Sequence, residues 1–162
     1  FNSLQGDKQI VDVLKQCGAE VMVGNHEVFV KKDKLLAFQF DATDVPDLFP
    51  PLVALAVNCK GKSIIKGVSR LKHKESDRAS TLQAEFGKLG ANIILEGDYM
   101  IIEGSALHGG NVFSNHDHRI AMALAIAALT INSKTIITGS DAVGKSWPGF
   151  FEQLVSLGAN IE

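Results

Sequence analysis

A run of seven consecutive polar residues is the first feature of this sequence that could do chemistry. It spans residues 72–78, reads Lys-His-Lys-Glu-Ser-Asp-Arg, and is followed by apolar residues at helical spacing. We therefore expect a helix over residues 75–89, with Lys74 to Ser76 near its N-cap. The helix dipole disfavours cations at this end by about 0.3–1 kcal/mol each. The cations thus favour a site for an external anion, with a solvated charge run as the alternative.

Polar side chains gather in the same way before four predicted helices. They are Asp44 and Asp47; Lys74, Glu75 and Arg78; Asp117, His118 and Arg119; and Lys145 and Ser146. If these helices pack side by side with one polarity, their N-termini converge on one face. The sequence then predicts an anion site with four cations, Lys74, Arg78, Arg119 and Lys145.

Carboxylates inside such a site would transfer protons rather than bind the anion. Glu75 is the better candidate, because it stands beside Lys74 in a crowded cationic segment. Asp47 lies near a predicted helix start, and helix capping explains it equally well. We interpret Asp77 and Asp117 as helix N-terminal acids, with Asp117 as an N-cap.

Two histidines, His116 and His118, flank Asp117 and raise the question of a metal site. Alternating positions rarely offer both imidazoles to one ion, and no Cys or Glu is spaced to complete the coordination shell. We therefore expect no metal here.

The elements that must position these residues alternate between helix and strand. We expect helices over 5–17, 44–57, 75–89, 117–129 and 148–157, strands over 20–23, 28–30, 36–40, 63–66, 92–95, 99–102 and 135–138, and a loop over 104–116. This alternation is typical of an α/β protein with parallel strand pairs and right-handed crossovers.

An internal repeat supports the α/β assignment. Gly18-Ala19-Glu20-Val21 recurs 72 residues later as Gly90-Ala91-Asn92-Ile93, and Gly67 recurs as Gly139 at the same offset. A third copy begins at Gly158. The pattern predicts βαβαββ-like units of about 70 residues, roughly 5–67, 68–139 and a partial unit 140–162, within one domain over residues 1–162.

Composition limits the class of partner. The chain has 162 residues with 46% hydrophobic residues and a net charge of −2, so we expect no general nucleic-acid binding. The longest apolar run, 120–129, is shorter than the ~20 residues of a membrane span, so we expect no membrane insertion. Cys17 and Cys59 lack metal-ligand spacing, which favours a reducing, cytoplasmic setting. We interpret the start at Phe1, without an initiator Met, as a processed or truncated polypeptide.

Several segments together resemble one known family. They are Asn2-Ser3-Leu4-Gln5-Gly6-Asp7, Asp44-Val45-Pro46-Asp47, Lys74-Glu75-Ser76-Asp77-Arg78, Asp117-His118-Arg119-Ile120-Ala121-Met122 and Lys145-Ser146-Trp147-Pro148-Gly149-Phe150-Phe151. In this order they resemble the C-terminal part of the 5-enolpyruvylshikimate-3-phosphate synthases, across essentially the whole chain.

The resemblance implies a fold and a reaction. The fold is one domain of the two-domain enolpyruvyl transferase fold, an inside-out α/β barrel with three βαβαββ units in each domain. The reaction transfers the enolpyruvyl group of phosphoenolpyruvate to the 5-hydroxyl of shikimate 3-phosphate and releases phosphate, without a metal or cofactor. It would place the chain in the shikimate pathway to chorismate and aromatic amino acids, in an enzyme that glyphosate targets.

Residue roles follow from the matching motifs. The resemblance implies that Asp47 takes the hydroxyl proton and holds the shikimate ring, that Glu75 protonates and later deprotonates the phosphoenolpyruvate methylene, and that Lys74 contacts the shikimate substrate. Arg78, Arg119 and Lys145 would bind phosphoenolpyruvate, with His118 supporting the site.

Two departures and one missing part qualify the resemblance. Arg70 stands where some members carry an Asn that binds shikimate 3-phosphate, and His73 stands where many have Val. The family's N-terminal domain supplies further phosphate contacts that this sequence lacks, so we expect the chain alone to be inactive. A related UDP-N-acetylglucosamine enolpyruvyl transferase and a non-catalytic anion-binding module of the same fold are the alternatives.

Overall fold

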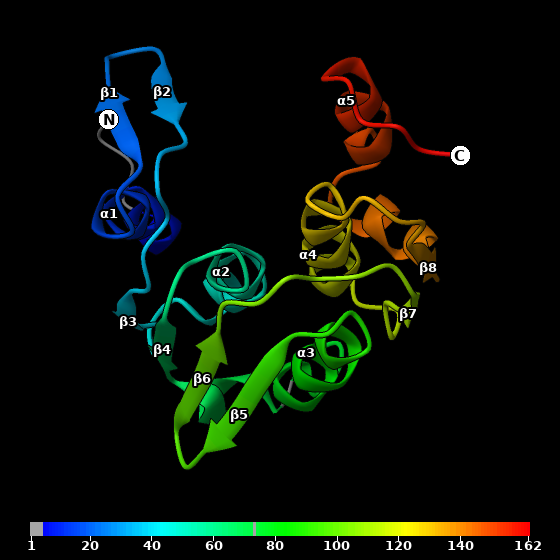
Figure 1. Ribbon diagram of the computed structural model, residues 1–162, viewed down its shortest axis with the longest axis horizontal. Helices are drawn as coiled ribbons and strands as arrows, with labels where there is room; N and C mark the ends of the chain where they lie inside the picture. The colour runs from blue at the N-terminus through cyan, green and yellow to red at the C-terminus, as the bar shows by residue number, and fades with distance from the viewer. Residues whose placement is uncertain (1–4, 73) are drawn as a thin grey trace.

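The structure is a computed structural model that describes residues 5–72 and 74–162. Three helices form the centre of the molecule. They are α2 (Phe49–Ala56), α3 (Arg78–Gly87) and α4 (His118–Ala128), and α4 packs against α2 while α3 contacts both (Figure 1). Their buried side chains, among them Phe49, Leu82, Phe86 and Leu124, belong to one apolar core. This packing brings the starts of the three helices close together.

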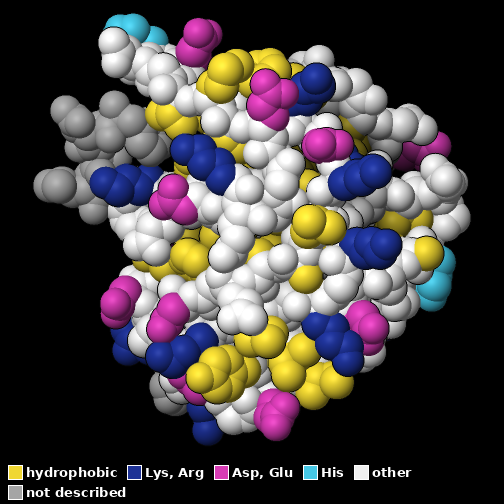
Figure 2. All heavy atoms as spheres, turned by 60° about the vertical axis from the view of Figure 1, so that its left-hand side comes forward, with side chains coloured by type: hydrophobic (Ala, Val, Ile, Leu, Met, Phe, Trp, Pro, Cys, Tyr) yellow, Lys and Arg dark blue, Asp and Glu magenta, His cyan; other side chains and the backbone are white. Residues whose placement is uncertain are grey.

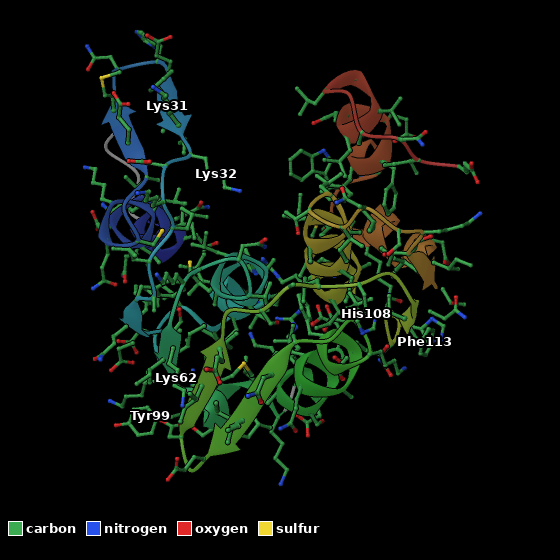
Figure 3. All side chains as sticks on the ribbon, in the orientation of Figure 1. Lys31, Lys32, Lys62, Tyr99, His108 and Phe113 are labelled. Atoms are coloured by element: carbon green, nitrogen blue, oxygen red, sulfur yellow. The ribbon has the colours of Figure 1, made fainter. Side chains whose placement is uncertain are left out.

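A four-stranded sheet covers one side of the helices, in the order β3-β4-β6-β5. Its strands are β3 (Gln39–Asp41), β4 (Lys62–Lys66), β5 (Asn92–Glu96) and β6 (Tyr99–Glu103). β3 and β4 run parallel, whereas β6 is antiparallel to both β4 and β5. Alternate residues such as Ile65, Met100 and Ile102 enter the core. Lys62 and Tyr99 project from the other, exposed face (Figure 3).

The remaining elements lie at the two ends of the molecule. At the N-terminal end are η1 (Gly6–Gln9), α1 (Ile10–Gln16) and an antiparallel hairpin of β1 (Glu20–Val23) and β2 (Val28–Lys31). At the C-terminal end are β7 (Asn111–Phe113), β8 (Ile136–Thr138), η4 (Ser140–Lys145) and α5 (Phe150–Ser156), with α5 packed on α4 and η4 in a small second core (Figure 1). The short helices η2 (Pro46–Leu48) and η3 (Val68–Leu71) precede α2 and follow β4.

Strand pairing recurs at the offset seen in the sequence. Gln39 pairs with Ile64 in the parallel β3–β4 ladder, and Asn111 pairs with Ile136, each 72 residues later, in the parallel β7–β8 ladder. The glycines at 18, 90 and 158 all adopt positive φ angles, between 92° and 98°, at the ends of α1, α3 and α5. Sequence and backbone geometry therefore share one periodicity.

Most predicted elements are confirmed with bounds that differ by a few residues, such as the strand expected over 36–40, which spans Gln39–Asp41, and three differences have a clear physical reason. The helix expected from residue 75 begins at Arg78, because Asp77 is its N-cap and accepts a hydrogen bond from the Ser80 amide. The loop expected over 104–116 contains β7, a three-residue strand too short to show a periodic pattern. η3 and η4 were not expected, because one or two turns of 3₁₀-helix leave little trace in the sequence. Residues 2–4 of the first motif and His73 lie outside the described residues.

Figure 2 shows the side of the molecule that carries the N-terminal elements. Charges of both signs are interspersed on this face. Blue and magenta side chains alternate there, with apolar side chains between them. Among the described residues, no helix is both long and apolar enough to cross a membrane.

Candidate functional site

The segments that begin α2, α3 and α4 bring charged side chains together at one place. Asp47 comes from η2, where Pro46 occupies the first turn and needs no amide hydrogen bond. Lys74 and Glu75 come from the stretch between η3 and α3, and Arg78 is the first residue of α3. Asp117 caps α4, and His118 and Arg119 are its first two residues. We call these seven residues the charged cluster.

Asp47 is shared by three cations in the charged cluster. Its Oδ1 accepts hydrogen bonds from Lys74 Nζ at 3.2 Å and from Arg78 Nη1 at 2.8 Å. Its Oδ2 lies 3.0 Å from Arg119 Nη2. The carboxylate retains 34% side-chain exposure. A carboxylate in this position can be reached by a ligand while cations hold it on several sides.

Arg78 is the most deeply buried member of the cluster, with 1% side-chain exposure. Its Nε donates to Asp117 Oδ2 at 2.7 Å, Nη1 donates to Asp47, and Nη2 donates to Glu75 Oε2 and, at 3.3 Å, to Asp117 Oδ1. In this structure the guanidinium is therefore bound by three carboxylates. An anion from solution can reach it only by replacing one of them.

Asp117 is a site residue that sequence reasoning treated as a helix cap alone. It does cap α4, since its Oδ1 accepts from the Arg119 amide at 2.9 Å. Its Oδ2 also accepts from Ser76 Oγ at 3.1 Å and from Arg78 Nε, and its side chain is fully buried. This second role could be inferred from the sequence only by pairing Asp117, the cap of a buried helix, with Arg78 at the start of another helix. That step requires knowing that α3 and α4 are in contact.

Glu75 and His118 face one another at the rim of the cluster. His118 Nδ1 lies 3.8 Å from Glu75 Oε1, and this nitrogen is buried without a hydrogen-bond partner among the described residues. Glu75 is 40% exposed. The His116 ring packs edge-on against Phe113 with centroids 5.1 Å apart, whereas His118 faces Glu75.

Lys145 and Arg70 lie outside this set of ion pairs. Lys145, the last residue of η4, donates from Nζ to the His116 carbonyl at 2.9 Å, next to the start of α4. Asn115 and His116, just before the start of α4, both have positive φ angles, 54° and 57°, a conformation uncommon for residues other than glycine. Arg70 is exposed in η3, and no hydrogen bond or ion pair joins its side chain to the described cluster residues.

The cations keep the two aspartates ionised. Burial alone would raise the pKa of Asp47, but Arg119, Lys74 and Arg78 outweigh burial and hold the pKa below its usual range. Burial likewise opposes ionisation of Asp117, and the hydrogen bonds from Arg78 lower its pKa nonetheless. For Arg78, burial is outweighed by Asp117, Glu75 and Asp47, so its pKa is raised.

Charge balance defines what this arrangement can do. Three carboxylates, from Asp47, Glu75 and Asp117, match three cations, from Lys74, Arg78 and Arg119. A bound anion would take over some of the cations and release carboxylates for proton transfer. The cluster therefore places cations that could hold an anion beside carboxylates that could transfer protons, at the starts of three helices.

The fold defines the class of protein. Solved structures with this fold include an enolpyruvyl transferase, NikO from Streptomyces tendae, with a TM-score of 0.76 and 22% identity over 96% of this chain and 36% of that one. An EPSP synthase from Acinetobacter baumannii matches with a TM-score of 0.86 and 29% identity over 94% of this chain and 39% of that one. The chain therefore has the α/β fold of the enolpyruvyl transferases.

The family follows from sequence. The family model for EPSP synthase (3-phosphoshikimate 1-carboxyvinyltransferase) matches residues 1–154, and the chain belongs to this family. Two relatives are named 3-phosphoshikimate 1-carboxyvinyltransferase. The one from Brachyspira hyodysenteriae is 41% identical, over 98% of this chain and 39% of the relative. The one from Clostridium kluyveri is 42% identical, over 99% of this chain and 38% of the relative. The chain thus spans about two fifths of the length of these relatives.

Proposed function

We propose that this chain forms part of an enzyme that transfers the enolpyruvyl group of phosphoenolpyruvate to the 5-hydroxyl of shikimate 3-phosphate. The observation that carries the proposal is the position of Asp47, whose carboxylate is held by Lys74, Arg78 and Arg119 at 2.8–3.2 Å while still accessible. A bound anion that takes over some of these cations would free this carboxylate to accept a proton. Membership of the EPSP synthase family supports the choice of reaction.

The proposed reaction uses both accessible carboxyl groups of the cluster. Asp47 accepts the proton of the attacking hydroxyl as its oxygen bonds to C2 of phosphoenolpyruvate, and Glu75 in its protonated form donates a proton to C3. The tetrahedral intermediate then loses phosphate from C2, the departing phosphate takes up the proton held by Asp47, and a proton from C3 returns to Glu75, which restores the double bond. His118 lies 3.8 Å from Glu75, where it can hold this carboxyl group in place.

The cations differ in how readily they can meet a substrate. Lys74 and Arg119 are 29% and 32% exposed, and Lys145 is exposed. We assign Lys74 to shikimate 3-phosphate, and Arg119, Lys145 and Arg78 to phosphoenolpyruvate. Arg78 makes its contact by exchanging Glu75 or Asp47 for the substrate. Arg70 is exposed in η3, the short helix that precedes Lys74 and Glu75 in the chain, and we assign it to shikimate 3-phosphate as well.

The remaining part of the enzyme is the proposed protein partner. Because the chain spans 39% of its relative in Brachyspira hyodysenteriae, further phosphate-binding groups would come from a second domain. Three such contacts at about 2 kcal/mol each amount to about four orders of magnitude in affinity. We assign the enzyme to the cytoplasm and to the biosynthesis of aromatic amino acids through chorismate.

Phosphate release tests the proposal. Phosphoenolpyruvate and shikimate 3-phosphate are supplied to the 162-residue chain alone, to the chain with the complementary domain in trans, and to the two domains joined. We expect release only when both domains are present. Absence of release from the joined domains would refute the function, and full release by the chain alone would refute the shared site.

A matched pair of variants separates the site from general surface charge. Arg119→Gln removes a cation 3.0 Å from Asp47, whereas Lys66→Gln removes one 2.9 Å from Asp41 on the sheet surface. In the joined enzyme we expect Arg119→Gln to raise the KM for phosphoenolpyruvate by about 10-fold or more and Lys66→Gln to leave it unchanged. Equal effects of the two variants would place the anion site elsewhere.

A further inference from the structure

We infer that Asp117 is a positioning residue that fixes one edge of the Arg78 guanidinium, so that the opposite edge faces the site and exchanges carboxylates for a substrate phosphate or carboxylate. This inference rests on the proposed function and adds a residue to it. The two edges of Arg78 differ in their partners, in how exposed those partners are and in how freely the partners can leave.

The fixed edge consists of Nε and one Nη2 hydrogen. Both meet Asp117, at 2.7 Å and 3.3 Å, in the bidentate arrangement that suits guanidinium and carboxylate. The side chains are 1% and 0% exposed, so neither partner can exchange with water without a large desolvation cost. This edge stays in place when ligands bind.

The exchangeable edge consists of Nη1 and the other Nη2 hydrogen. Its partners, Asp47 and Glu75, are 34% and 40% exposed and can turn into solvent. A substrate anion offers the same oxygen geometry, so it can replace them on Arg78. Their release frees the two groups to which the proposed reaction assigns proton transfer.

Asp117 is itself held from three directions. It accepts from Arg78, from Ser76 Oγ at 3.1 Å, and from the Arg119 amide at 2.9 Å. It therefore ties the segment before α3 to the start of α4, which packs against both α2 and α3. No other described carboxylate contacts Arg78 from a fully buried position.

The first experiment compares Asp117→Asn with Asp77→Asn in the joined, two-domain enzyme. Both residues are helix N-caps, but Asp77 is exposed and has no ion pair with a cation among the described residues. We expect the Kd for phosphoenolpyruvate to rise on the order of 10- to 100-fold in Asp117→Asn and to stay within about twofold in Asp77→Asn. An unchanged Kd in Asp117→Asn would overturn the inference.

A double-mutant cycle distinguishes positioning from general destabilisation. If Asp117 acts through Arg78, then Asp117→Asn adds little to the Kd change of Arg78→Lys, because both remove the same oriented contact. Effects that multiply fully would show that Asp117 acts independently of Arg78 and would overturn the inference.

A measurement on the unaltered enzyme covers the case in which Asp117→Asn does not fold. In an NMR spectrum with labelled arginine, the Arg78 Nε–H signal should remain protected from solvent exchange on addition of phosphoenolpyruvate, while the Nη signals shift. Loss of Nε–H protection would overturn the inference. If phosphoenolpyruvate binds nowhere on the unaltered enzyme and no phosphate is released, the proposed function fails instead, which separates the two failures.

Discussion

Arg78 and Asp117, 39 residues apart in the sequence, form an ion pair in which both side chains are removed from solvent. The pair joins the first residue of α3 to the cap of α4. Buried pairs of this kind contribute little net energy when intact, yet breaking one leaves an uncompensated charge. Stability is therefore expected to depend on this contact, and under the inference above substrate binding depends on it as well.

Arg78→Met is expected to destabilise the chain by about 3–5 kcal/mol, because Asp117 would remain buried without its counter-ion. Urea unfolding followed by circular dichroism measures the change. Lys66→Met is the control, since its pair with Asp41 is exposed and the unfolding midpoint should stay nearly unchanged. Equal midpoints for the two variants would contradict the structural importance assigned to Arg78.

Glu75→Gln in the joined enzyme is expected to lower kcat by about 10²–10⁴-fold, the usual loss when a general acid–base group is removed. The amide oxygen can still accept a hydrogen bond from Arg78, so the KM values should change far less. Glu96→Gln, at the exposed end of β5, serves as the control. Turnover close to normal in Glu75→Gln would exclude this residue from proton transfer.

Acid should destabilise the chain through its aspartates. Burial opposes ionisation of Asp47 and Asp117, but Arg119 lowers the pKa of Asp47 and Arg78 lowers the pKa of Asp117 in the folded state. Hydrogen bonds from Thr43 and Lys66 lower the pKa of Asp41 to about 2. Because an unfolded Asp has a pKa of about 3.9, the unfolded chain binds protons first as the pH falls.

The ionised forms of these three aspartates thus contribute fully to the stability of the folded chain above about pH 4. This contribution is lost as the pH falls through their folded pKa values, near 2 for Asp41. Urea unfolding at pH values from 6 to about 2 measures this loss. Asp117→Asn should flatten the acid dependence, because one of the shifted groups is gone. An acid dependence as steep as that of the parent would mean that Asp117 is not ionised in the folded protein.

Gly67→Ala should destabilise the chain by more than about 1 kcal/mol. Gly67 has φ of 109°, and an added Cβ would lie 2.8 Å from the Thr43 amide nitrogen. Gly87→Ala, in α3 with open space around the added Cβ, is the matched control and should raise stability by about 0.4–1 kcal/mol. Thermal unfolding of both variants measures the difference, and stabilisation of Gly67→Ala would contradict the close approach of the two segments.

Sequence alone predicted the elements whose signals are local. The hairpin β1–β2, the strands β5 and β6, and the start of α4 at Asp117 follow from turn residues, alternation and an N-cap within a few residues of one another. The pairing of β7 with β8 does not, because a three-residue strand has too few positions to show alternation. The local signal also placed the start of α3 three residues early, because the N-cap is Asp77 and the polar residues Lys74 and Glu75 lie before it, outside the helix.

For the site, the sequence determined which residue types stand at the helix starts, and it singled out Asp47, Glu75, Arg78 and Arg119 as candidates. Only the tertiary structure decided how they pair. Arg78 meets Asp47 across 31 residues and Asp117 across 39, and these contacts depend on the packing of α2, α3 and α4. An ion pair is set by distance and burial, which no spacing in the chain encodes, so the role of Asp117 emerged only once the three helices were seen side by side.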